Sequence, residues 1–314
     1  MNSPLRLSLT PPGPVDLPRV LGTGFGLGEP STRREGEAFW RATRVTTGPV
    51  TIRAQLQQEQ IAIELWGAGR DEAVERLEGW LGFFDQPQAL VPKDDVVARA
   101  QKRHPGLRLS RGFDIFEVLL PTILGQRVTG REAMDSWRQI VWRYGERAPG
   151  PLAKLWVPPS PAALRGMSFP RLNQFGVELA RARVFVGACH HEAHIRRAAA
   201  TTPKKAIGEL RKLSGIGPWT AHLTVAKVHG YPDAMPLGDY HIPSVVSHAL
   251  TGEERADDRR MVELLAPYVG QRWRVIRLIG ADAKHAPRRG ALRAPWQGQV
   301  DVARGGAGRG GGRV

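Results

Sequence analysis

A turn with two glycines lies between two predicted helices at residues 213–221, which read Leu-Ser-Gly-Ile-Gly-Pro-Trp-Thr-Ala. The basic segment 203–213 is predicted to be a helix that ends at this turn, and Pro218 suits the first position of the next helix. Gly215 and Gly217 allow the backbone to approach a ligand closely, and free N–H groups at a helix start attract an anion such as a phosphodiester. Alone, the pattern also fits an ordinary tight connection between helices.

A carboxylate follows at Asp239, eighteen residues beyond Ala221. A carboxylate can stabilise positive charge in a transition state, and it can orient or deprotonate a water molecule. The same residue type also serves as a purely structural helix N-cap. The hairpin and the carboxylate together are more specific than either alone.

The chain is strongly basic. It has 314 residues and a net charge of +15, and 37 of its 45 cationic side chains are arginine. This excess favours a polyanionic partner, although an arginine-rich composition that serves solubility is the alternative. Hydrophobic residues make up 41% of the chain, which excludes a wholly disordered protein.

These residues resemble the helix-hairpin-helix DNA glycosylases, in particular the family of bacterial 3-methyladenine DNA glycosylase II. Residues 213–221 are similar to the family hairpin, and residues 236–240 are similar to the segment that carries the catalytic Asp. Residues 105–109 and 123–126 match the start of the family's helical domain. The resemblance covers residues 36–285.

The resemblance implies base excision repair by a glycosylase that flips out a damaged, alkylated purine and hydrolyses its N-glycosidic bond, with Asp239 as the catalytic residue. Bond cleavage builds positive charge on the deoxyribose, which an ionised carboxylate stabilises. Bifunctional members carry a nucleophilic Lys two residues past the second glycine, where this chain has Trp219. We therefore expect a monofunctional enzyme without AP lyase activity. The resemblance also implies a monomer whose partner is double-stranded DNA that contains damaged bases.

Trp219 and Leu223 are the expected pocket residues. An indole face attracts a positively charged alkylated purine by about 0.5–2 kcal/mol, whereas core packing is the alternative role for Trp219. Leu223 stands where the family has a Tyr, and the position of a further aromatic residue late in the last helix falls at Asp282. Because the expected pocket has fewer aromatic residues than that of the family, a deaminated or oxidised base is an alternative substrate.

The remaining predicted site residues contact DNA or hold a cation. Arg127 follows Gln126 at the position of the family's wedge, so it fills the gap left by the flipped nucleotide or pairs with phosphate. The other expected DNA contacts are Gln126 and the hairpin residues Ser214, Gly215, Gly217 and Thr220. No cofactor is required, and the resemblance implies a monovalent cation, Na⁺ or K⁺, bound by the backbone carbonyls of Arg211, Leu213 and Ile216.

The single cysteine, Cys189, excludes an intrachain disulfide, a four-Cys zinc site and an all-Cys iron–sulfur cluster. His190, His191 and His194 follow it, but without a carboxylate or second Cys at useful spacing we interpret them as an ordinary helix end. Five prolines within the first twenty residues interrupt any signal-peptide core, so the expected location is the cytoplasm, in association with the nucleoid.

The predicted fold is α+β in four parts. Residues 1–35 are predicted to be an irregular Pro/Gly-rich arm, and residues 286–314 a disordered Arg/Gly-rich tail that binds nucleic acid or aids solubility. Residues 36–92 form a small antiparallel sheet with a helix. Residues 93–285 form the helical domain.

Periodicity supports these two folded parts. Residues 52–57 and 61–65 alternate between apolar and polar, which predicts two half-buried strands joined near residues 58–60. One helix should follow, with an apolar stripe made of Val74, Leu77, Trp80, Leu81 and Phe84. No strand is expected after Pro92, and the predicted helical segments are 94–103, 113–126, 129–144, 160–167, 176–194, 204–213, 218–229, 239–250, 257–267 and 271–285. Pro121 should kink or delimit the second of these.

Two alternative functions also fit the sequence. The first is a non-catalytic helix-hairpin-helix DNA-binding protein in which Asp239 is inert, and the spacing of Asp239 from the hairpin argues against it. The second is a glycosylase for deaminated or oxidised bases, which the less aromatic pocket leaves open.

Overall fold

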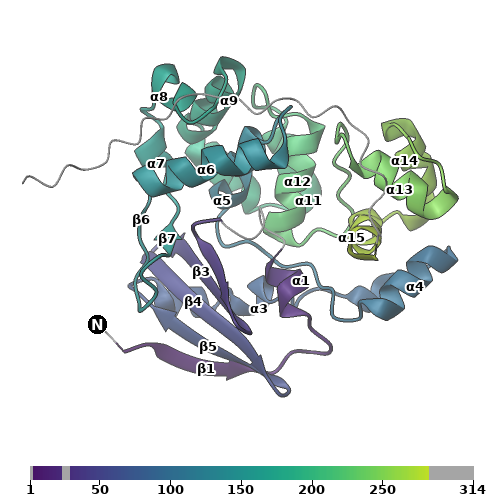
Figure 1. Ribbon diagram of the computed structural model, residues 1–314, viewed down its shortest axis with the longest axis horizontal. Helices are drawn as coiled ribbons and strands as arrows, with labels where there is room; N and C mark the ends of the chain where they lie inside the picture. Colours follow the sequence, from purple (N-terminus) through teal and green to yellow (C-terminus); the bar gives the residue numbers. More distant parts are fainter. Residues whose placement is uncertain (1–2, 23–28, 283–314) are drawn as a thin grey trace, which may run out of the picture.

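The computed structural model describes residues 3–22 and 29–282, and its fold is α+β (Figure 1). A five-stranded antiparallel sheet lies beneath a larger layer of helices. Its strand order is β1-β5-β4-β3-β2, and the strands are β1 Leu5–Leu9, β2 Thr32–Glu35, β3 Ala38–Val45, β4 Gly48–Gln57 and β5 Gln60–Trp66. The predicted pair of strands corresponds to β4 and β5.

The prediction of an irregular arm over residues 1–35 is wrong for three segments. Leu5–Leu9 pairs with β5, with Leu5 opposite Leu65, so it forms an edge of the sheet. The short helix α1, Leu17–Leu21, buries Leu17 and Val20, and β2 forms the other edge of the sheet. The prolines that suggested irregular structure, such as Pro4 and Pro11, lie just outside β1, where they remove no ladder hydrogen bond.

The two faces of the sheet pack against different partners. One face, which includes Ile52, Ile61 and Ile63, packs against two short helices, α2 Arg70–Val74 and α3 Leu77–Trp80. The single helix expected here is therefore divided in two. Phe84, expected on its buried stripe, is 51% exposed beneath the Arg111 guanidinium.

The other face of the sheet packs against a pair of two-residue strands that the sequence did not predict. These are β6 Glu146–Arg147 and β7 Trp156–Val157, and Val157 joins Trp40 and Trp66 in a small core of their own. The two indoles are stacked with their centroids 5.4 Å apart. Both faces of the sheet are therefore covered by apolar contacts.

Each predicted helical segment contains a helix, and the bounds differ by a few residues at most ends. The helices are α4 Asp95–Arg103, α5 Phe116–Leu124, α6 Gly130–Tyr144, α7 Pro161–Leu164, α8 Phe169–Asn173, α9 Leu179–His190, α10 Glu192–Ala199, α11 Pro203–Leu210, α12 Pro218–His229, α13 Ile242–Thr251, α14 Asp258–Leu265 and α15 Arg272–Asp282. The sequence missed α8, and it merged α9 with α10. Pro121 does not delimit α5, which continues through it to Leu124.

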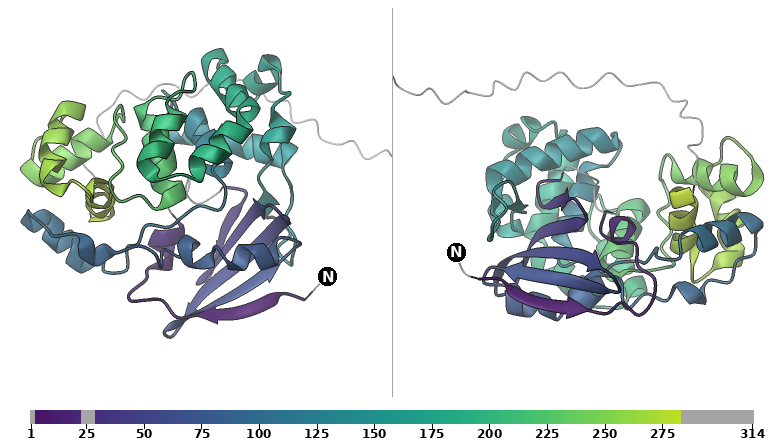
Figure 2. Two further views of the ribbon diagram at one scale, coloured as in Figure 1. Left: turned by 180° about the vertical axis from the view of Figure 1, so that it is seen from behind. Right: turned by 60° about the horizontal axis from the view of Figure 1, so that its bottom comes forward.

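The helices bury two separate cores, and α12 contributes to both. The first core gathers side chains from α5 to α11, and Ala221 and Val225 of α12 belong to it. The second gathers α4 and α13 to α15, and Ala226 of α12 belongs to that one. Figure 2 shows α4, an early segment, lying alongside the C-terminal helices, in agreement with its contacts with α15.

A buried ion pair joins the N-terminal part to the last helix. Arg274 of α15 donates two hydrogen bonds to the carboxylate of Asp85, and the two side chains are 2% and 4% exposed. Asp85 also accepts the backbone N–H of Leu109 at 2.9 Å. Removing either partner would leave a buried charge without compensation.

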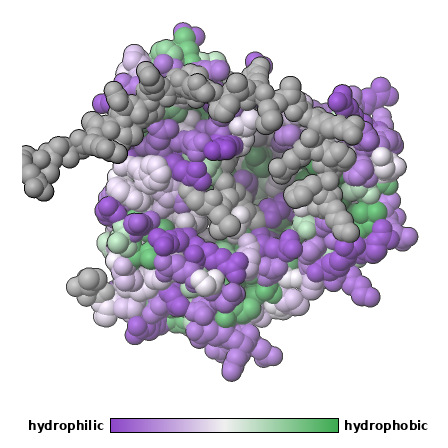
Figure 3. Space-filling model, in the orientation of Figure 1, coloured by the Kyte–Doolittle hydropathy of each residue, from purple (hydrophilic) through white to green (hydrophobic). Residues whose placement is uncertain are grey.

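Figure 3 shows a largely hydrophilic face, as expected of a chain with this charge. In the described ranges, no helix combines the length and apolar character that a bilayer span requires. The predicted tail, 286–314, lies outside the described residues.

We expect Asp85→Ala to lower the free energy of unfolding by about 3–5 kcal/mol, because it leaves the Arg274 guanidinium buried and unpaired. Urea unfolding followed by circular dichroism measures this. The control is Arg259→Ala, which breaks an exposed pair with Glu263 and should cost about 0–1 kcal/mol. Equal losses in the two variants would contradict this role of the ion pair.

Candidate active site

The two hairpin glycines have different structural requirements. Gly215 has φ +79°, and a Cβ there would lie 2.1 Å from Cγ2 of Val184 on α9, so both the turn and the packing demand glycine. Gly217 has an ordinary φ of −83°, and a Cβ there would meet no atom within 4 Å. Because Gly217 has no side chain, its backbone can be approached from outside the molecule, and packing inside the molecule does not require glycine there.

The start of α12 offers an anion site at this opening. Gly217 is the N-cap and provides no side chain, so no capping side chain covers the first N–H groups of α12 among the described residues. Those groups carry partial positive charge and point out of the helix start. Ser214 and Gly215 are exposed beside them, as predicted for residues that contact a DNA backbone.

Gln126 and Thr220 support the hairpin from within. The Gln126 amide donates to the carbonyl oxygen of Gly215 and to the hydroxyl of Thr220, each at 2.9 Å. Thr220 is only 2% exposed. The two side chains, which the sequence predicts to contact DNA, bond to each other and fasten the end of α5 to the hairpin.

Asp239 lies between the starts of two helices. Its Oδ1 accepts the backbone N–H groups of His241 and Ile242 at 2.8 and 2.9 Å, at the beginning of α13. Its Oδ2 accepts the indole N–H of Trp219, at the beginning of α12, at 2.8 Å. Oδ1 thus caps the start of α13, which is the structural role considered from the sequence, and Oδ2 is bonded to Trp219 next to the hairpin. Three donors suit an ionised carboxylate, which only accepts.

Trp219 forms one side of the site. A Cβ on Gly125 would lie 3.3 Å from Cη2 of the indole, and a Cβ on Gly238 would lie 3.9 Å from its Cβ. The partly buried ring therefore extends from the loop that carries Asp239 to the C-terminal end of α5. Leu223, one turn along α12, packs against the second core.

Arg127 follows the anchored Gln126 and has an unusual backbone. Its φ is +58°, in the left-handed region that residues with a side chain seldom occupy. The side chain is exposed, and it bonds to no other described residue. Backbone strain of this kind clusters at functional sites because the surrounding structure has to impose it.

Comparisons with known proteins agree with this geometry. No protein-family model matches the chain. The chain is 25% identical over 195 residues to a DNA-3-methyladenine glycosylase from Bacillus subtilis, a match that covers 59% of the chain and 63% of that protein, which is less than two thirds of its length. It is 26% identical over 233 residues to DNA-3-methyladenine glycosylase 2 from Escherichia coli, covering 70% of the chain and 77% of that protein.

A solved structure of a 3-methyladenine DNA glycosylase from Archaeoglobus fulgidus superposes with a TM-score of 0.76 at 20% identity, covering 88% of the chain and 98% of that structure. This likeness shows a shared fold, and the two relatives add sequence similarity. In fold and in sequence the chain thus resembles the DNA-3-methyladenine glycosylases.

Within this fold, the sequence analysis missed three residues around Asp239. His222, one turn beyond Trp219, accepts the N–H of Met235 through Nδ1, and Asp258 accepts the N–H of Gly238. Tyr240 is 80% exposed beside Asp239, and its ring packs edge to face on His241. Polar residues at helical spacing from Trp219 are the signal that could have identified His222, whereas Asp258 is brought close by folding alone.

The histidines after Cys189 lie where α9 ends and α10 begins. The Cys189 thiol is buried, and burial raises its pKa to about 12. His194 on α10 lies 3.3 Å from the carbonyl oxygen of Glu209 on α11. In the described part of the chain, no three His, Cys, Asp or Glu side chains cluster in a way that could hold a metal ion. Asp282, at the position of the expected aromatic, pairs with Arg103 at 2.8 Å.

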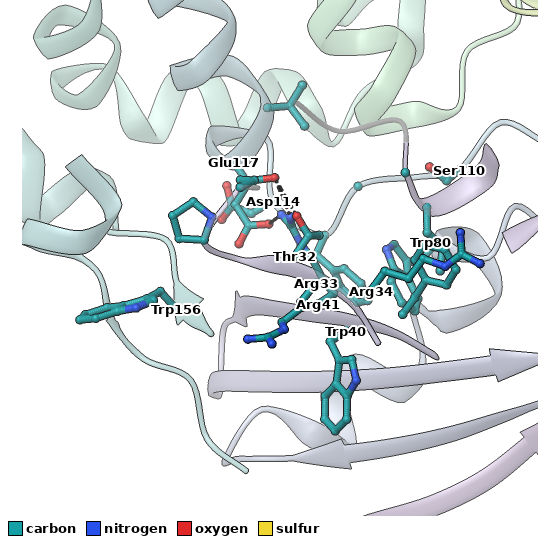
Figure 4. Close-up of a pocket in the computed structure, with 18 of the residues that line it drawn as sticks. Thr32, Arg33, Arg34, Trp40, Arg41, Trp80, Ser110, Asp114, Glu117 and Trp156 are labelled. Carbon is teal, nitrogen blue, oxygen red and sulfur yellow. Dashed lines mark hydrogen bonds and ion pairs between the residues drawn. The ribbon is translucent and has the colours of Figure 1, made fainter. Parts of the chain in front are cut away.

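A cavity of about 610 Å³, shown in Figure 4, does not include Asp239 among its described lining residues. It lies against the sheet at the N-terminal end of α5, whereas Gly125 and Trp219 meet at the C-terminal end. On its wall, burial raises the pKa of Glu117 even though Arg41 pairs with it. This charge pair fastens β3 to α5.

The two hairpin glycines give a stability prediction. Gly215→Ala should lose at least about 2 kcal/mol of unfolding free energy, because it combines a left-handed backbone with a clash against Val184. Gly217→Ala should stay within about 1 kcal/mol of the wild type. Chemical denaturation of the two single variants compares them directly, and similar losses would refute the assignment of different roles.

Proposed function

We propose that this chain is a monofunctional DNA glycosylase of base excision repair that removes damaged, alkylated purines from double-stranded DNA. The observation that carries the proposal is the 2.8 Å hydrogen bond from the Trp219 indole to the Asp239 carboxylate, which brings the carboxylate beside the hairpin anion site. The names of the two relatives support the substrate class.

The hairpin holds the DNA backbone in this mechanism. The uncapped N–H groups at the start of α12 bind a phosphate, and the bare Gly217 allows the sugar-phosphate chain to come close. A base that leaves the helix can then stack against Trp219, whose indole attracts a positively charged alkylated purine. The partly buried Leu223 adds apolar surface without an aromatic face.

Asp239 performs the chemical step. As the N-glycosidic bond breaks, its electron pair leaves with the base, and positive charge grows on the deoxyribose. The carboxylate stabilises that charge, orients the water whose oxygen adds to the anomeric carbon, and accepts the proton that this water releases. Because two amides of α13 and the Trp219 indole already hold both carboxylate oxygens, little reorganisation is needed when the charge develops.

A monovalent cation at the hairpin is part of the proposal. Within the described structure, the carbonyl oxygens of Arg211 and Ile216 accept no backbone hydrogen bond. That of Leu213 accepts one, from Ile216 at 3.1 Å, which leaves a lone pair. These three oxygens fit Na⁺ or K⁺, which would add positive charge beside the phosphate, and no other cofactor is required.

We expect Asp239→Asn to slow single-turnover base excision by at least about a hundredfold, because the amide can still accept the two backbone N–H groups but loses the charge and the acceptor for the Trp219 indole. Affinity for an abasic-site analogue should remain near that of the wild type. Asp257→Asn, which alters an exposed N-cap of α14 in the same way, is the control and should excise normally.

The assay uses oligonucleotides with single defined lesions, and alkali reveals the abasic sites. Normal excision by Asp239→Asn would disprove the catalytic assignment. Binding by the wild type without excision of any lesion would favour a non-catalytic DNA-binding protein. Excision confined to deaminated or oxidised bases would correct the substrate class.

Strand cleavage should require alkali or an added lyase, because Trp219 replaces the nucleophilic Lys of bifunctional enzymes. Lys227 is a further amine on α12, and burial lowers its pKa to about 8, but it lies eight residues from Trp219, a rise of about 12 Å along the helix. Borohydride added during turnover should therefore trap no covalent adduct. A trapped adduct would show that the enzyme is bifunctional.

Arg127→Ala should slow excision and weaken binding to an abasic-site analogue while affinity for undamaged duplex changes little, because a wedge acts only once a nucleotide has left the stack. Arg131→Ala is the control, since that side chain is 92% exposed in the first turn of α6. Binding is measured across a salt series. Equal weakening on both duplexes, with a slope of log K against log salt about 0.9 flatter, would make Arg127 a phosphate contact instead.

A further inference from the structure

The segment that links α12 to α13 carries Asp239 near its end, and hydrogen bonds fix it at several points. At its beginning, Asp233 accepts the N–H of Gly270 at 2.7 Å and pairs with Arg272 through two contacts of 2.6 Å. Past this point the chain has to reach Asp239 through residues 234–238. Two side chains from different helices bond to the backbone within that stretch.

His222 is the first of them. Its Nδ1 accepts the backbone N–H of Met235 at 2.9 Å, and Met235 is 4% exposed. Burial, and then the nearby charges of Arg211 and Arg272, lower the pKa of His222 to about 4. The imidazole is therefore neutral at physiological pH, and its Nδ1 is free to act as an acceptor.

Asp258 is the second. As a residue of the first turn of α14, it accepts the N–H of Gly238 at 2.7 Å, immediately before Asp239. Gly238 has φ +90°, a conformation that favours glycine and sets the direction in which the chain enters Asp239. The acceptor holds this turn in place from the outer side.

We propose that His222 and Asp258 are positioning residues that hold residues 235–238 so that the Asp239 carboxylate meets the Trp219 indole and faces the sugar. His222 and Trp219 lie one turn apart on α12, so this helix fixes both the beginning and the end of the short segment. α14 fixes Gly238, the residue directly before Asp239. The inference rests on the glycosylase activity proposed above and extends it to residues that touch neither base nor sugar.

The test depends on pairs of variants with the same shape. Asn and Leu are nearly isosteric, and both are neutral, but only Asn offers an acceptor close to the branch point of the side chain. His222→Asn should therefore keep the hydrogen bond to Met235, and His222→Leu should lose it. Asp258→Asn and Asp258→Leu form the same comparison at Gly238.

The readout is the single-turnover excision rate at saturating enzyme, below the melting temperature of each variant. We expect each Leu variant to be at least about tenfold slower than its Asn partner, because a catalytic group that is loosely held loses preorganisation. The Asn variants should lie within about threefold of the wild type. Affinity for an abasic-site analogue should be the same within each pair, since the hairpin is unchanged. If the two residues had a merely structural role, the Leu variants would be less stable, but their excision rates would not fall relative to their affinity for the abasic-site analogue.

Amide hydrogen exchange completes the experiment. The N–H groups of Met235 and Gly238 should be protected in the wild type and in the Asn variants, and each Leu variant should lose protection at its own site. Equal rates within both pairs, or fast exchange of both amides in the wild type, would overturn the proposal. If one Leu variant fails to fold, the other pair decides.

The wild type and Asp239→Asn are measured alongside. If the wild type excises no lesion while both amides remain protected, the proposed activity fails and the attachment of the loop stands. If the wild type is active and the pairs do not differ, the positioning role alone fails.

Discussion

Burial of α12 between two hydrophobic cores is the constraint on which the site depends. Ala221 and Val225 pack into the core of α5 to α11, and Ala226 packs into the core of α4 and α13 to α15. The small alanines allow the neighbouring helices to approach closely. Because both sides of the helix are buried, its N-terminal end is held in a fixed place, and Gly217 and Trp219 are fixed with it.

The carboxylate at the site is supported from several directions at once. Asp239 bonds to the amides of α13 with one oxygen and to the Trp219 indole with the other. The start of α13 favours negative charge, and so does the start of α12. The bonds that cap α13 therefore also orient the carboxylate.

The sheet contributes through α5. Arg41 of β3 pairs with Glu117 in the first turn of α5 and with Glu29, while Thr43 donates to Glu117. The other end of α5 leads to Gln126, which is bonded to the hairpin. A rigid helix therefore joins the N-terminal sheet to the hairpin. The large cavity at the sheet end and the candidate site at the hairpin end occupy opposite ends of the same helix.

The sequence by itself determined the local features. Alternating residues 52–57 and 61–65 specified two strands, and the double-glycine turn specified a hairpin with an uncapped helix, because these depend on neighbours within a few residues. The spacing of Asp239 from that turn, with the family resemblance, identified the residue that now lies beside Trp219.

Tertiary structure decided the rest. The edge strand Leu5–Leu9 exists because β5 offers it a partner nearly sixty residues away. Likewise, Gln126 turned inward to the hairpin, and Asp258 reached Gly238, through contacts between residues distant in the chain. Which donor meets which acceptor over such separations depends on how the two cores pack against α12. A local sequence pattern does not predict that packing.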